Sequence, residues 1–200
     1  MKNKVLHRTA RCIAVLLPAA ALVGSTAVLA EDPPLPMHFA GLINDYVPAS
    51  VSGGPWEVRG KWSLDLREED GTPTASFSAA VTMETPSGAS AHTHHFSMTG
   101  ATVSSSTSGC PSFSPPTSGF AVSGMATITA NGGQAPFAPN GETSPLTVCV
   151  LGGTKVEFSN VTLQLQPPAS NHFGLQAIHG VVVKCSWFRG FTSADCAVSK

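Results

Sequence analysis

The stretch "WEVRGKWSLDLR" at residues 56–67 alternates apolar and polar side chains, with glycine at one apolar position. Because successive side chains of a strand point to opposite faces, this pattern predicts a long strand with one face buried and one in water. "TASFSAAVTME" at 74–84 repeats the pattern after the turn residues "EEDGTP". The two stretches therefore predict an antiparallel hairpin.

Period-two patterns continue through most of the chain after residue 36, at 37–43, 91–99, 119–130, 146–152, 155–166, 173–185 and 186–191. No apolar pattern of helical period extends beyond two turns outside residues 1–30. We therefore predict a single all-β domain over 37–200, an antiparallel β-barrel or a two-sheet sandwich of about eight or nine strands. Short connections favour an up-and-down barrel, and Gly, Pro and Ser mark two long loops at 104–119 and 131–145.

Residues 1–30 have the composition of a cleaved signal peptide. Four basic residues precede an apolar run that ends in small residues before Glu31. We expect export of a bacterial Sec type, a secreted or periplasmic location and no stable membrane anchor. The proline-rich "EDPPLP" at 31–36 is then an extended lead-in to the folded domain.

The charge left after removal of residues 1–30 limits the class of partner. Seven basic side chains remain against twelve acidic ones. A nucleic acid or an anionic lipid surface would need a basic patch, so we expect a metal ion or a small molecule as the partner and no nucleic acid. The oligomeric state is left open by the sequence.

Four cysteines remain after residue 30, and an even number in an exported chain predicts two disulfides. Three pairings are possible. We favour a local loop between Cys185 and Cys196 and a longer bridge between Cys110 and Cys149. The chain has no Cys-x-x-Cys pair, which argues against a thioredoxin-type redox site.

Three histidines fall within "HTHH" at residues 92–95. On a strand His92 and His94 share a face with Phe96, whereas His95 points the other way. Two imidazoles about 6.6 Å apart along a strand can converge on one ion if a third ligand joins them, and nitrogen ligands suit zinc or copper. The structural alternative is a set of hydrogen-bonded histidines with no ligand.

The third ligand is predicted to come from "NHFGLQAIHG" at 171–180, with His38 as a further candidate. His179 has the parity of Leu175 and Val181, which predicts an inward orientation. His172 precedes the strand predicted there and is placed to line a barrel mouth. The candidate metal ligands are thus His92, His94, His172 and His179.

Two other functions fit the same fold. "RGKWSL" resembles the Gly-x-Trp signature of lipocalin barrels over three residues only, and a carrier of small apolar molecules would have its interior lined by Trp56, Trp62, Phe77, Val81 and Phe96. A structural envelope or surface protein would need no site. No nucleophile with its acid and base is visible, which favours binding over catalysis and leaves an enzyme open only through a three-histidine metal site.

Overall fold

The computed structural model describes residues 36–48, 51, 54–111, 118–131, 141–152 and 158–187. Within these residues the chain forms eight strands and one short helix. The elements are β1 (Met37–Val47), β2 (Trp56–Glu69), β3 (Thr72–Glu84), β4 (His92–Ser104), β5 (Ser118–Ala130), β6 (Glu142–Gly152), β7 (Asn160–Leu165), α1 (Ser170–Phe173) and β8 (Ile178–Trp187).

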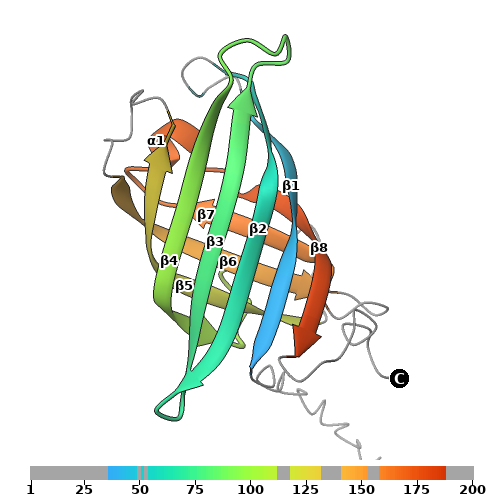
Figure 1. Cartoon of the computed structure of the whole chain (residues 1–200), viewed down its shortest axis with the longest axis vertical. Coiled ribbons are helices and arrows are strands. Elements are labelled where there is room, and N and C mark those ends of the chain that lie inside the picture. Colours follow the sequence, from blue (N-terminus) through green and yellow to red (C-terminus); the bar gives the residue numbers. More distant parts are fainter. Residues whose placement is uncertain are drawn as a thin grey trace, which may run out of the picture.

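The strands close into one antiparallel barrel in sequence order (Figure 1). Each strand pairs with the next, and β8 returns to pair with β1. In Figure 1 β2, β3 and β4 run steeply at the front while β6 and β7 cross behind them. This closure confirms the predicted all-β class and selects the up-and-down barrel over the two-sheet sandwich.

The alternation in β2 and β3 builds one wall of the core. Of the inward positions predicted from Trp56 to Leu66, all are buried except the half-buried Gly60. A Cβ atom at Gly60 would lie 2.1 Å from the carbonyl oxygen of Ala80, so the glycine permits a close approach of the two strands. The inward residues of β3 are buried as predicted.

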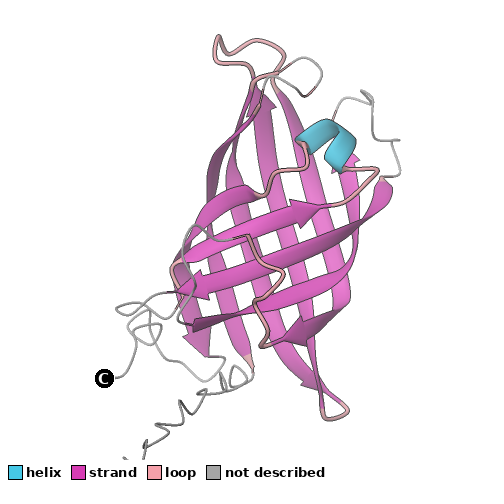
Figure 2. Cartoon of the chain, turned by 180° about the vertical axis from the view of Figure 1, so that it is seen from behind, coloured by secondary structure: helices cyan, strands magenta, loops and turns pink. Residues whose placement is uncertain are grey.

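The turn between β2 and β3 consists of Asp70 and Gly71. Both residues have positive φ, at 51° and 75°, and the ladder resumes with Glu69 opposite Thr72. Two central residues in this region match the right-handed twist of the flanking strands, which explains why Asp-Gly directs a tight hairpin. The hairpin lies at one end of the barrel, and α1 lies at the opposite end (Figure 2).

The stretch 173–185 is not one continuous strand, contrary to prediction. Residues 170–173 form α1, Gly174 follows with a φ of 86°, and β8 begins only at Ile178. The register of β8 against β1 then shifts between Ala40 and Gly41. Because α1 interrupts the alternation before β8, Leu175 is 75% exposed and Val181 is 47% exposed.

The disulfide between Cys110 and Cys149 is confirmed and joins the segment after β4 to the centre of β6. Cys185 is buried, with 1% of its surface exposed. Its predicted partner Cys196 lies outside the described residues, so that pairing stays a prediction. Residues 1–35 also lie outside them, and with them the predicted signal peptide.

Candidate metal centre

The first two candidate ligands come from the start of β4, where strand parity places them as predicted. His94 is 1% exposed and His92 is half-buried, whereas His95 is exposed on the outer face. The ladder with β3 sets Val81 opposite His94 and Met83 opposite His92. Residues paired in this way project from the same face of a sheet, so both imidazoles point into one end of the barrel.

The third candidate ligand, His172, is carried by α1, which follows Pro167 and Pro168. The turn closes through hydrogen bonds from the backbone N–H of Ser170 to Gln166 and of His172 to Ala169. Proline fixes φ near the helical value and favours the start of a helix, whereas it cannot donate to a strand ladder. This local chemistry explains why the chain turns here instead of extending.

Ser144 on β6 holds the beginning of this turn. Its hydroxyl donates to the carbonyl oxygen of Gln166 at 2.6 Å and accepts from the backbone N–H of Ala169 at 3.2 Å. Ser144 is fully buried. A buried hydroxyl that satisfies two backbone groups fixes the turn to the barrel wall.

Phe173 anchors the other end of α1. Its side chain is fully buried, with its ring centroid 5.2 Å from that of Phe96 and 5.0 Å from that of His94. Burial of a phenylalanine contributes about 2–3 kcal/mol. Because His172 is the adjacent residue, Ser144 and Phe173 together determine where its imidazole lies.

The three imidazoles converge through their Nε2 atoms. The Nε2 atom of His172 lies 3.0 Å from Nε2 of His94 and 3.2 Å from Nε2 of His92. Nitrogen ligands of a tetrahedral ion at about 2.0–2.1 Å are about 3.3–3.4 Å apart. The cluster of His92, His94 and His172 is therefore within metal-binding distance, and these three form the group of potential ligands found in the described part of the chain.

His92 has the tautomer that a ligand needs. Its Nδ1 atom lies 2.9 Å from the carbonyl oxygen of Ser90, which can only accept a hydrogen bond. Nδ1 therefore carries the proton, and in the neutral ring Nε2 presents a lone pair to the cluster. A second hydrogen bond of this kind is what orients histidine ligands in metal proteins.

Burial keeps His94 and His172 neutral. The pKa of His94 is lowered to about 3, chiefly by burial and then by the nearby His172 and His92, while a hydrogen bond with the Thr129 backbone acts in the opposite direction. The pKa of His172 is lowered to about 4, first by burial and then by His92. Both rings are thus neutral at pH 7, which is the state that binds metal.

Aromatic side chains surround the cluster. The Trp56 ring meets His92 edge-on with centroids 5.0 Å apart, and Phe173 meets His172 at the same distance. Such ring contacts fix the imidazole planes without consuming their nitrogen atoms.

The remaining histidines after residue 36 lie elsewhere. His38 contacts Asp65 at 2.7 Å through Nδ1. His179 contacts Asp45 through Nδ1 at 3.0 Å and through its backbone N–H at 2.7 Å, and its side chain is 40% exposed. The predicted inward orientation of His179 with Leu175 and Val181 is wrong, because the parity was extended across α1, where alternation does not apply.

The five residues predicted to line a carrier site belong to the continuous hydrophobic core: Trp56, Trp62, Phe77, Val81 and Phe96. Trp62 packs against Gly41 and donates from its indole nitrogen to the carbonyl oxygen of Val181 at 3.3 Å. These residues have the packing contacts of a core, and this favours a structural role for them.

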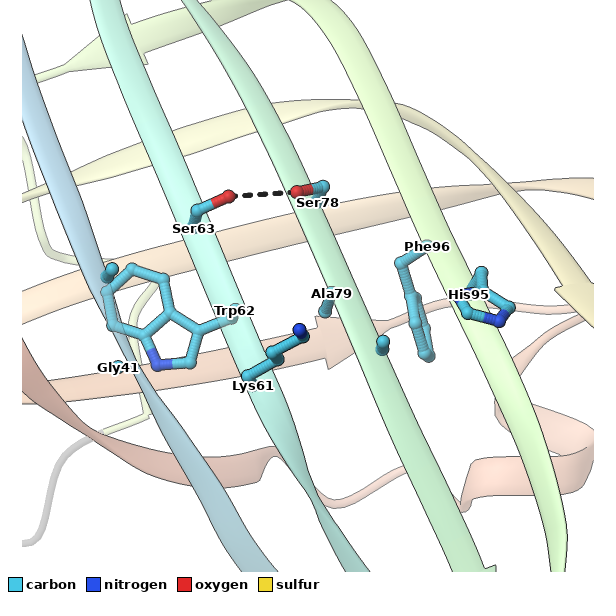
Figure 3. Close-up of a pocket in the computed structure, with 10 residues that line it drawn as sticks. Gly41, Lys61, Trp62, Ser63, Ser78, Ala79, His95 and Phe96 are labelled. Atoms are coloured by element: carbon cyan, nitrogen blue, oxygen red, sulfur yellow. Dashed lines mark hydrogen bonds between the residues drawn. The ribbon is translucent and has the colours of Figure 1, made fainter.

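A hollow of about 470 Å³ lies along β1, β2, β3 and β4 (Figure 3). The residues that line it come alternately from the inner and the outer face of the sheet. Trp62 and Phe96 are buried, whereas Lys61 and His95 are exposed. Since neighbouring residues of a strand point to opposite faces, one internal cavity cannot be lined by both. We interpret the hollow as a part of the barrel wall where the side chains are small. The carrier interpretation gains no support from it.

Sequence reasoning did not identify Ser144, Phe173 or Ser90 as parts of the site. The adjacent prolines before residue 169 were the one local signal for a turn that could have directed attention to α1. Ser144 is separated from this turn by more than twenty residues, so only the closed barrel brings it there.

Comparison with protein-family models, with curated proteins and with solved structures gives no match. No helix in the described part of the chain is long and apolar enough to cross a membrane.

Proposed function

We propose that this protein binds a divalent first-row transition-metal ion through the Nε2 atoms of His92, His94 and His172. One observation carries the proposal: Nε2 of His172 lies within 3.2 Å of Nε2 of both other rings. Nitrogen donors favour zinc or copper(II) over magnesium or calcium, which prefer oxygen.

The hydrogen-bonding capacity of the three rings favours a metal over a purely structural cluster. A neutral imidazole has one N–H, and that of His92 is directed to Ser90. The Nε2 lone pair of His92 therefore faces Nε2 of His172. That one atom of His172 has short contacts to both His92 and His94, and it can form a hydrogen bond in only one of them. A cation satisfies all three lone pairs at once.

Metal titration of the untagged, chelator-treated protein tests the proposal. We expect one zinc ion per chain by calorimetry, and a loss of affinity in His172→Ala that exceeds the 10–100-fold typical for removal of an outer-shell partner. His95→Ala is the matched control, since His95 lies on β4 but faces water. Unchanged zinc affinity in His172→Ala contradicts the proposal.

We also propose that the protein acts in a secreted or periplasmic compartment. The composition of residues 1–30 supports this, and a disulfide such as Cys110–Cys149 persists in an oxidising environment. Mass spectrometry of the exported protein should find its first residue at Glu31. Recovery of the chain from the cytosol with residues 1–30 attached contradicts this assignment.

A further inference from the structure

We propose that the metal ion held by His92, His94 and His172 keeps an exchangeable coordination position that takes a small anion, such as azide, hydroxide or a carboxylate. This inference rests on the proposed function and adds to it the chemical class of a second ligand. It is carried by the number of donors, their charge and the uneven burial of the three rings.

The group supplies three donors, whereas zinc and related ions take at least four ligands. Two other histidines in the described part of the chain, His38 and His179, contact Asp65 and Asp45 instead. Among the described residues no cysteine or carboxylate joins the group. The remaining position is therefore available to a ligand from solution, as in zinc sites with three protein ligands and a bound water.

The charge of the centre selects an anion. Histidine coordinates as a neutral ligand, so three histidines leave the full double positive charge of the ion uncompensated. Glu84 lies 3.2 Å from Arg59 and is thus engaged away from the centre. In a partly buried site with aromatic neighbours, an uncompensated charge is costly, and an anionic ligand reduces that cost.

The burial of the rings indicates the side from which this ligand enters. His94 is 1% exposed and faces the core beside Phe173. His92 and His172 are half-buried, and the start of β4 lies at the same end of the barrel as α1 (Figure 1). An ion bound by all three Nε2 atoms would therefore be covered by the protein core on the side of His94. Its open side would face the end of the barrel. Trp56 packs against His92 with ring centroids 5.0 Å apart, and this bulky neighbour favours small ligands.

Cobalt(II) substitution tests the inference, because the visible d–d bands of cobalt report both its binding and its ligands. We expect the cobalt spectrum of the full-length protein to change saturably when azide is added in excess at constant ionic strength. His95→Ala, the matched control, should give the same spectrum and the same azide response.

The outcomes separate the two proposals. A protein-bound cobalt spectrum that does not respond to azide overturns the open position and leaves metal binding intact. The absence of any protein-bound cobalt spectrum overturns both. A saturable azide response in the parent protein that is lost in His172→Ala, measured with that variant still folded by far-ultraviolet circular dichroism, supports both.

Discussion

Acidification should destabilise the metal-free protein through His94. The pKa of this histidine is about 3 in the folded chain, against 6.5 for an unperturbed ring, chiefly because burial disfavours the charged form. Between these two values the unfolded chain binds a proton at His94 and the folded chain does not. Stability is therefore unaffected above pH 6.5 and falls as the pH drops from 6.5 towards 3.

The magnitude follows from the linkage between proton binding and folding. Each pH unit below 6.5 costs about 1.4 kcal/mol for one such group, so lowering the pH to about 4.5 removes about 3 kcal/mol. His172, whose pKa is lowered to about 4, adds a loss in the same direction. That second contribution is reduced by solvent screening because the ring is only half-buried.

Urea denaturation followed by tryptophan fluorescence measures the effect, in chelator, at neutral pH and at about pH 4.5. The comparison is with His94→Gln, which lacks the titrating group. Each protein is compared with itself at the two pH values, so the constant cost of the substitution cancels. We expect the parent protein to lose about 3 kcal/mol more than His94→Gln.

His95→Gln is the control, because His95 lies on the same strand and is exposed. It should keep the full pH dependence of the parent protein. Equal losses in the parent protein and in His94→Gln would refute the reasoning, since they would mean that His94 is protonated in the folded state as readily as in the unfolded chain.

Three further predictions concern the bound ion, the disulfide and the barrel wall. Zinc at about 100 times its dissociation constant should stabilise the protein by about 3 kcal/mol and raise Tm by about 5–10 °C. Scanning calorimetry measures this shift, which should be absent in His172→Ala. The Cys110→Ser/Cys149→Ser variant should lose about 4 kcal/mol in urea denaturation, since the bridge spans 39 residues; an unchanged midpoint contradicts this. Gly41→Ala should lose at least about 2 kcal/mol, because its Cβ atom would lie 1.8 Å from a carbonyl oxygen of β8, whereas Gly109→Ala, with open space around it, should match the parent protein.

The architecture was predictable because its information is local. Alternation in β2 and β3 gives the buried face of each strand, and Asp70-Gly71 gives the turn that joins them. Short connections then leave neighbours in sequence as neighbours in the sheet. The sequence did not decide whether β8 pairs with β1. A closed barrel and a two-sheet sandwich both bury the inward faces, and both have the same alternation of side chains.

The end of the chain shows where local information fails. α1 has four residues, too few to give a periodic apolar signal, and it interrupts the phase before β8. A further register shift beside Gly41 interrupts it again. A parity argument is valid only within an unbroken ladder, and the 173–185 stretch contains two breaks.

The same limit explains why the sequence placed His92 and His94 on one face but could name His172 and His179 only as alternatives for the third position. His92 and His94 lie two residues apart in one uninterrupted strand, so their common face follows from geometry alone. His172 is positioned by Phe173, which is buried in the core, and by Ser144, which reaches the turn from β6. These contacts exist only after the barrel has closed. The cluster of His92, His94 and His172 is therefore a product of the tertiary fold, and Ser144 and Phe173 determine whether its third imidazole is in place.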